Sequence, residues 1–511
     1  MDDIKFIIEK LKKSIDNLEI KAELNDIGKV IAFNDGVVLI DGLNEVQSME
    51  ILVVKKEKLN IKLLALNLEE SLIGAVCLNN FDLLQHNDIV YRTKQVASIG
   101  VDERLLGRVI NPLGDFLDNL SPIEFTNFYP IERSAPSVTE RSPVSVPLHT
   151  GIKIIDSLIP IGRGQRELIL GDRQTGKTSI ALDVILNQKQ DVFETPVCIY
   201  VAIGQKLSKI KRFYEILKKE GALDYTIIVA TSSEDYPTLL YLAPYVGCAL
   251  GEYFMDQGKD VLVIYDDLTK HAWAWREISL LLKRPVGREA YPGDIFYIHS
   301  RLLERAAKLN KGGSLTALPI CETQLGDISA YIPTNLISIT DGQIYLDNGL
   351  FKSNFRPAIN IGLSVSRVGS KAQTKIIKKI TGKMKLSLAQ YRELESFAQL
   401  STELPQEMHR ILLRGKIILE LLKQDNLHPL SFEKLAILMY AVQNGYFDDF
   451  NLQDIRLVES KLIDYLENDC SSLLAQIREV KDLTDDIEIA IKNALQNFFT
   501  FLTINNEKNI A

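Results

Sequence analysis

A short stretch of the chain, GDRQTGKTS from Gly171 to Ser179, combines glycines, a lysine and hydroxyl side chains at the spacing GxxxxGK[ST]. Glycines let successive backbone N–H groups turn towards an anion, Lys177 can reach the β- and γ-phosphates of a nucleotide, and the Thr178 hydroxyl can ligate Mg²⁺. The largely apolar residues 167–170 predict a strand before the loop, and residues 180–186 predict a helix whose positive end faces the anion. We therefore expect a loop that binds the phosphates of a nucleotide together with Mg²⁺.

Two more apolar runs end in side chains that could complete this site. Residues 261–267, VLVIYDD, predict a buried strand that ends in carboxylates, and we expect Asp266 to orient Mg²⁺ through water. Residues 196–202 predict a second strand, and Gln205 follows it at the position where a residue that activates water is expected. An amide can position water but cannot take its proton. The pattern therefore favours binding over turnover.

Composition excludes several other classes of protein. The 511 residues carry a net charge of -8 without a long basic stripe, which argues against a dedicated nucleic-acid binder. The five cysteines lie far apart and form no C-x-x-C pair, so neither a disulfide framework nor a zinc site is expected. Apolar runs fall short of the roughly 20 residues that span a bilayer, and the amino terminus does not resemble a signal peptide. We expect a cytoplasmic protein without direct membrane insertion that could still dock on a membrane complex.

Changes in periodicity along the chain divide it into four parts. Residues 1–23 carry apolar side chains at helical spacing and predict an amphipathic helix. Short alternating runs separated by turns predict a β-barrel over residues 24–95. Strand and helix patterns alternate over residues 96–375, which is typical of an α/β nucleotide-binding domain. Helical periodicity then predicts a C-terminal helical bundle over residues 376–511.

Longer strings around these residues resemble the alpha subunits of ATP synthases, in the same order and with similar spacing along nearly the whole chain. The resemblance implies an N-terminal six-stranded β-barrel, a central RecA-like α/β domain with the phosphate loop, and a C-terminal helical bundle. Besides the loop itself, the strings are YVAIGQK (200–206), YDDLTKHAWAWRE (265–277), RPVGREAYPGDIFYIHSRLLERAAK (284–308), YIPTNLISITDGQI (331–344) and RPAINIGLSVSRVGS (356–370).

The same resemblance implies a tightly bound Mg-ATP that this chain does not hydrolyse. The catalytic beta subunits of the family carry a glutamate where Gln205 stands here. Asn426 replaces a glutamine that contacts the base in the family. The residues implied to bind the nucleotide are Gly171, Asp172, Arg173, Gln174, Thr175, Gly176, Lys177, Thr178, Ser179, Gln205, Asp266, Arg356, Pro357, Gln424 and Asn426, with Thr178 and Asp266 serving the metal.

One arginine matches a residue that acts outside its own subunit. Arg367, within SVSRVG, corresponds to the arginine that alpha subunits donate to the active site of a neighbouring beta subunit, and Ser364 is expected to support it. Such an arginine finger neutralises oxygens of the phosphoryl group during transfer. Read without the resemblance, an arginine among small residues is more typical of a surface or salt-bridge position.

The resemblance also implies partners: catalytic beta subunits in an alternating hexamer, a central gamma-like rotor shaft, and a delta-like peripheral-stalk subunit contacted by the N-terminal helix. It implies a location at the cytoplasmic face of the cell membrane.

Three alternative interpretations stay open at this point. A diverged bacterial paralogue could hydrolyse ATP for mechanical work. A catalytic homohexamer, similar to secretion- or helicase-type ATPases, would be expected to have a carboxylate in place of Gln205. A purely structural ring subunit would need neither Arg367 nor an intact phosphate loop.

Overall fold

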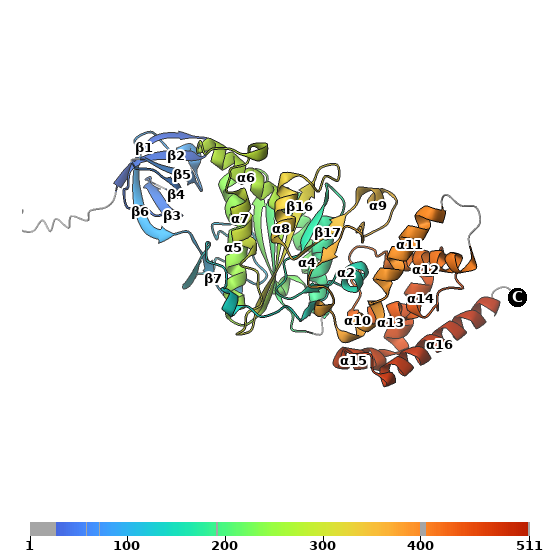
Figure 1. Ribbon diagram of the computed structural model, residues 1–511. Helices are drawn as coiled ribbons and strands as arrows, with labels where there is room; N and C mark the ends of the chain where they lie inside the picture. Colours follow the sequence, from blue (N-terminus) through green and yellow to red (C-terminus); the bar gives the residue numbers. More distant parts are fainter. Residues whose placement is uncertain (1–26, 58, 71, 191–192, 399–404, 509–511) are drawn as a thin grey trace, which may run out of the picture. The chain divides into compact units, whose positions relative to one another are not determined.

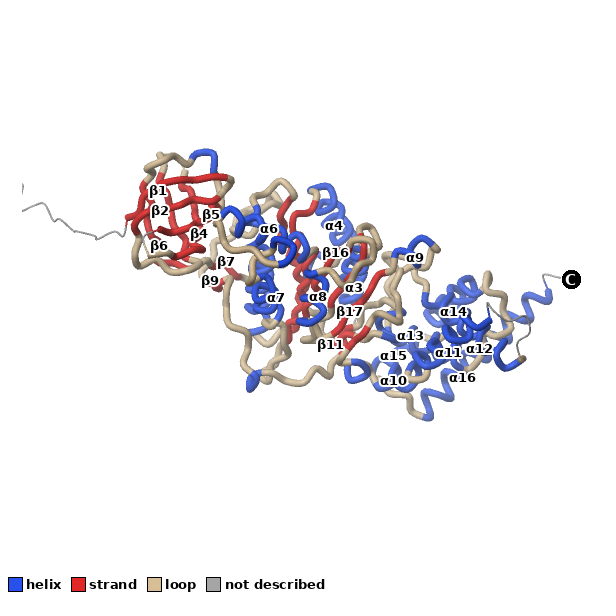
Figure 2. Tube along the Cα trace, turned by 45° about the horizontal axis from the view of Figure 1, so that its top comes forward, coloured by secondary structure: helices blue, strands red, loops and turns tan. Residues whose placement is uncertain are grey.

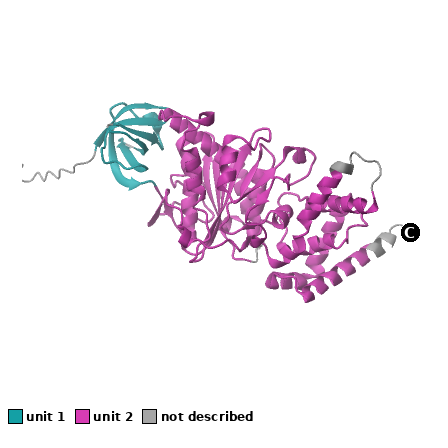
Figure 3. Ribbon diagram, viewed as in Figure 1, with its two compact units in different colours: residues 1–97 teal, residues 98–511 magenta. Residues whose placement is uncertain are grey.

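The computed structural model describes residues 27–57, 59–70, 72–190, 193–398 and 405–508. The helix predicted over residues 1–23 lies outside them. The chain divides into two compact units, residues 1–97 and residues 98–511, which are coloured separately in Figure 3.

The first unit is a closed six-stranded β-barrel, which confirms the predicted architecture. Alternate side chains such as Val38, Ile40, Leu52 and Val54 point into its core because neighbouring residues of a strand face opposite sides of the sheet. The sixth strand, IVYRTKQV, is weakly patterned, since residues 92–95 are all polar and break the alternation. In barrel order the strands are β1 (Ile27–Asn34), β2 (Val37–Gly42), β5 (Leu72–Cys77), β4 (Asn60–Leu68), β3 (Glu50–Lys55) and β6 (Ile89–Val96).

The second unit is built on an eight-stranded sheet whose strands pair in parallel, except that β18 is antiparallel to β17 (Figures 1 and 2). Its central strands are continuous apolar runs because helices cover both faces. In sheet order the strands are β18 (Val365–Ser366), β17 (Gly342–Leu346), β12 (Leu168–Asp172), β16 (Ser314–Thr323), β15 (Asp260–Asp266), β13 (Val197–Gln205), β14 (Thr226–Ser232) and β8 (Val109–Ile110). Two small two-stranded sheets accompany it: β7 (Ser98–Val101) with β9 (Asn127–Pro130), and β10 (Pro147–Leu148) with β11 (Ile161–Gly162).

Close contacts show which helices cover each face of this sheet. On one face the Phe213 ring stacks on Tyr200 of β13 with 3.9 Å between ring centroids. On the other face α5 approaches so closely that a Cβ added at Gly247 would lie 2.3 Å from the Val201 side chain. The helices of this region are α2 (Lys153–Leu158), α3 (Lys177–Asn187), α4 (Leu207–Lys219), α5 (Pro237–Asp256), α6 (Leu268–Leu281), α7 (Ile295–Leu303), α8 (Tyr331–Ile339) and α9 (Asn348–Lys352).

The C-terminal part of the second unit is helical, as predicted. Its apolar side chains, including Ile437, Leu462 and Ile491, share one hydrophobic core with the α3 side of the sheet. The helices are α10 (Lys375–Thr381), α11 (Met384–Ala398), α12 (Gln406–Leu422), α13 (Phe432–Gln443), α14 (Ile455–Asp469), α15 (Ser471–Val480) and α16 (Asp485–Lys508). None of the helices in the described ranges is long and apolar enough to cross a membrane.

Candidate nucleotide-binding site

The phosphate loop joins the end of β12 to the start of α3, which begins at Lys177. Gly176 caps this helix with φ at 104°, a conformation that residues with a side chain rarely adopt. The first N–H groups of a helix have no partner within it, so the loop offers backbone donors to an anion at the positive end of α3. The Lys177 ammonium donates to the carbonyl oxygens of Gly171 and Asp172, at 2.8 and 2.6 Å.

Burial lowers the pKa of Lys177, and the nearby carboxylates of Glu322, Asp267 and Asp266 act in the opposite direction. These carboxylates favour the charged ammonium in a position where water is largely excluded. Lys177 is therefore suited to exchange its carbonyl partners for phosphate oxygens. Glu322 was not identified from the sequence.

The remaining loop residues divide into those that shape the loop and those that are exposed. Asp172 accepts hydrogen bonds from the Thr323 hydroxyl at 2.7 Å and from the Gly326 amide at 2.8 Å, so its carboxylate ties the loop to the end of β16. Thr175 donates to the Asp172 carbonyl at 2.8 Å. Arg173 and Gln174 are exposed.

The ends of β13 and β15 bring a polar cluster to the first turn of α3. Asp266 accepts a hydrogen bond from the Thr178 hydroxyl at 2.7 Å and one from the Tyr200 hydroxyl at 2.8 Å. The Gln205 amide donates to the carboxylate and to the carbonyl of Asp266, both at 2.9 Å. Since β12, β13 and β15 are parallel members of one sheet, their carboxyl ends meet at the same edge. A hydroxyl beside a carboxylate is a set of hard oxygen ligands that suits Mg²⁺.

A lysine that sequence reasoning missed belongs to this cluster. The Lys209 ammonium lies 2.9 Å from the Thr178 hydroxyl oxygen, 3.0 Å from the Gln205 amide oxygen and 3.4 Å from the Asp266 carboxylate. The only sequence signal was its place four residues after Gln205, in the first turn of the next helix.

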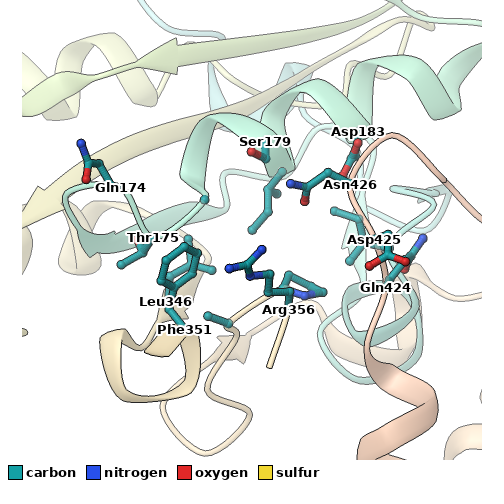
Figure 4. Close-up of a pocket in the computed structure, with 15 residues that line it drawn as sticks. Gln174, Thr175, Ser179, Asp183, Leu346, Phe351, Arg356, Gln424, Asp425 and Asn426 are labelled. Carbon is teal, nitrogen blue, oxygen red and sulfur yellow. The ribbon is translucent and has the colours of Figure 1, made fainter. Parts of the chain in front are cut away.

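A cavity of about 160 Å³ adjoins the loop and is lined by residues from four segments of the chain, as Figure 4 shows. Arg356 reaches into it, with its guanidinium over the Phe351 ring at 4.9 Å from the centroid. Ser179, Asp183 and Asn426 lie together on another side. Pro357 and Gln424 also line this cavity, so the structure brings together all the residues expected around the base.

Gln424 has a second role that the sequence did not indicate. Its amide nitrogen donates to the carbonyl oxygens of Gly151 and His428, both at 2.7 Å, and its amide oxygen accepts from the Lys153 N–H at 2.8 Å. Both donors of the side chain are therefore used by backbone. Gln424 fastens the segment after α12 to the start of α2, and in this arrangement it has no N–H left for a base.

Asp183 is a buried acid in the same cavity that sequence reasoning also missed. It projects from α3, accepts the Leu427 N–H at 2.8 Å, and burial raises its pKa from 3.8 to about 6. An acid on the inner face of an amphipathic helix was a signal that the sequence already contained.

Arg367 lies elsewhere, beside a second cavity of about 340 Å³ that is also lined by Arg141, Arg166, Lys308 and Lys371. It follows β18, and its N–H donates to the Asp341 carbonyl at 2.8 Å, next to the start of β17. This is the amino edge of the sheet, opposite the phosphate loop. Among the described residues, its exposed guanidinium has no hydrogen-bond or ion-pair partner.

Ser364 holds the segment that leads to this arginine. It accepts the Tyr345 N–H at 2.9 Å and donates to the Asn360 carbonyl at 2.7 Å. The serine therefore ties the chain before β18 to β17.

Comparison with known proteins agrees with this geometry. Residues 151–366 match the nucleotide-binding domain of the ATP synthase alpha/beta family, and residues 373–498 match the C-terminal domain of ATP synthase alpha/beta chains. The ATP synthase subunit alpha of Petrotoga mobilis is 52% identical over 502 residues, which cover 97% of this chain and 98% of that protein. These matches confirm the resemblance seen in the sequence: the chain belongs to the ATP synthase alpha/beta family and, within it, to the alpha subunits.

Proposed function

We propose that this chain is the regulatory subunit of a rotary ATP synthase or ATPase head. It binds ATP or ADP with Mg²⁺ at its own phosphate loop without hydrolysing it, and it provides Arg367 to the catalytic site of a neighbouring beta subunit. The observation that carries the proposal is the placement of the loop and Arg367 at opposite edges of one sheet.

Binding at the chain's own loop follows from the groups at the carboxyl edge. The start of α3 and the Lys177 ammonium would hold the phosphates, while Arg356, Pro357 and Asn426 would surround the base. Thr178 and Asp266 would hold Mg²⁺, which neutralises phosphate charge when it is bound.

The absence of hydrolysis follows from the state of Gln205. This side chain is buried, both of its N–H groups donate to Asp266, and it has no basic atom that could take a proton from water. Asp267 is a second candidate base in this region, because burial raises its pKa to about 6. However, its carboxylate caps α6 by accepting the Lys270 N–H at 2.9 Å, which commits it to the helix.

The role of Arg367 follows from its distance from that loop. The strand β12 has five residues, which separates the two edges of the sheet by about 13 Å. Arg367 thus lies at the edge away from the chain's own nucleotide, and its guanidinium, which has no hydrogen-bond or ion-pair partner among the described residues, is available to another subunit. There it would stabilise charge that develops on the transferring phosphoryl group, an effect on the order of 10³ to 10⁵ in rate in other systems.

These roles require the partners that an alpha subunit has in its family. We propose an alternating hexamer with beta subunits around a gamma-like rotor shaft, at the cytoplasmic face of the membrane. A delta-like peripheral-stalk subunit would contact residues 1–23, which the structure does not describe.

A single-turnover experiment on the isolated chain tests the silent site. Protein free of beta subunits is saturated with radiolabelled Mg-ATP, and phosphate release is followed with Lys177→Ala as the control for contaminating ATPases. We expect ATP to be bound and recovered intact, and activity to arise when beta subunits are added.

Hydrolysis that disappears in Lys177→Ala would contradict the regulatory assignment. It would favour the catalytic homohexamer, and Asp267→Asn would then show whether Asp267 serves as the base.

A further inference from the structure

Lys209 places a positive charge within the oxygen cluster expected to hold the metal. Its three N–H donors face three oxygens, those of Thr178, Gln205 and Asp266, all within 3.4 Å. An ammonium has three donors, so this set uses its full capacity.

The surrounding structure holds the lysine in this position. It lies in the first turn of α4, one residue before the buried Ile210 and four residues before Phe213, whose ring stacks on Tyr200. Tyr200 in turn donates to Asp266 at 2.8 Å. The buried face of α4 thereby fixes the direction of the Lys209 side chain, which stays 41% exposed and reachable from solvent.

Lys209 occupies one of the two lone pairs of the Thr178 hydroxyl that could otherwise accept a metal ion. The hydroxyl donates its hydrogen to Asp266 and accepts from Lys209, so one lone pair remains. The ammonium also neutralises part of the Asp266 charge that would otherwise attract a divalent cation.

We propose that the Lys209 ammonium is a built-in cation that replaces part of the role of Mg²⁺ at this nucleotide site, so that the chain binds metal-free ATP nearly as well as Mg-ATP. The proposal rests on the nucleotide site put forward above. In the nucleotide-bound chain, Lys209 would exchange its longest contact, the one to the Asp266 carboxylate at 3.4 Å, for a phosphate oxygen that a bound metal would otherwise neutralise.

Calorimetric titration of the full-length chain with ATP, in excess Mg²⁺ and in EDTA, tests this role. The wild type is compared with Lys209→Met, which keeps the length of the side chain and removes the charge. Lys211→Met is the matched control, because Lys211 is an exposed lysine two residues further along the same helix.

For the wild type we expect dissociation constants in EDTA and in Mg²⁺ that agree within about threefold. Lys209→Met should weaken binding in EDTA by about tenfold or more, as expected for the loss of a charge-assisted hydrogen bond. Its affinity in Mg²⁺ should change by less than about threefold, and Lys211→Met should behave as the wild type in both buffers.

A second readout follows the metal itself. Electron paramagnetic resonance of Mn²⁺ titrated into the ATP-bound chain should show tighter metal binding in Lys209→Met than in the wild type, because a repelling charge has been removed.

The role of Lys209 would be overturned if the wild type bound ATP more than tenfold more weakly in EDTA than in Mg²⁺ and Lys209→Met showed the same difference. This result differs from a failure of the nucleotide site, in which no ATP binding that depends on Lys177 would be detected in either buffer.

Discussion

The two edges of the central sheet differ in how fully their polar groups are engaged. At the carboxyl edge, Asp266 and Gln205 are bonded to each other and to neighbouring groups. At the amino edge, Arg367 is exposed and, among the residues that the structure describes, has no ion-pair partner. A group that must hold a ligand still is preorganised by its neighbours, whereas a group meant for another molecule has to be left free.

In the proposed function, one domain performs two tasks, one at each edge of its sheet. None of the hydrogen bonds described above joins Arg367 to the groups around Asp266, so a substitution at one edge leaves the contacts at the other in place. Substitutions at each edge can therefore separate nucleotide binding by this chain from catalysis in the complex.

The largest effect is expected from Arg367→Ala. The assembled complex should lose about 10³-fold or more of its ATPase turnover, because in the proposed role the guanidinium acts only on the neighbour's transition state. Affinity of the isolated chain for ATP should stay within about twofold of the wild type. Steady-state turnover of complexes matched for subunit content measures the loss, and Lys371→Ala, in the same cavity, is the control. Wild-type turnover in a correctly assembled Arg367→Ala ring would rule out the finger.

Lys177→Ala should instead impair the binding of ATP by this chain, which Arg367→Ala leaves nearly unchanged. Loss of the charged donor should weaken ATP binding by about 100-fold or more, since the charge-assisted hydrogen bonds that Lys177 is proposed to donate to phosphate are removed. Calorimetry on the isolated chain measures the change, and Lys206→Ala, an exposed lysine before α4, is the control. Equal affinities for the wild type and the Lys177 variant would show that the loop does not bind phosphate.

The smallest effect concerns Asp183 and depends on pH. Because its pKa is about 6 in the folded chain and 3.8 is its ordinary value, its contribution to stability is fully present below pH 3.8 and is lost as pH rises through 6. The loss amounts to about 3 kcal/mol at most. Asp183→Asn keeps an oxygen for the Leu427 N–H and cannot ionise, so it should be more stable than the wild type at pH 7.5.

Differential scanning calorimetry at pH 4.5 and pH 7.5 measures this effect. The advantage of Asp183→Asn should grow with pH, whereas Asp224→Asn, at an exposed position, should follow the wild type. An advantage of the same size at both pH values would show that the carboxyl does not titrate in this range.

Much of the fold could be predicted from local patterns. Alternating apolar residues indicated the barrel, and long apolar runs indicated strands that are covered on both faces. These patterns can be read locally because the faces that a strand buries are recorded in its own sequence. The sixth barrel strand was weakly marked, since the polar residues in IVYRTKQV obscure the alternation and only pairing with β1 and β3 defines it.

The sequence by itself determined the groups that begin or end an element: the phosphate loop, Asp266 after one buried strand, and Gln205 after another. Their chemistry follows from residue type and from the rule that parallel strands present their carboxyl ends at one edge. Only the tertiary structure decided what other segments bring to these groups. It placed Lys209 among the oxygens around Asp266, used the Gln424 amide to hold backbone, and put Arg367 at the opposite edge. The reason is that contacts between side chains distant in sequence depend on how the helices pack on the sheet. The periodicity of one segment does not show which other segment will pack against it.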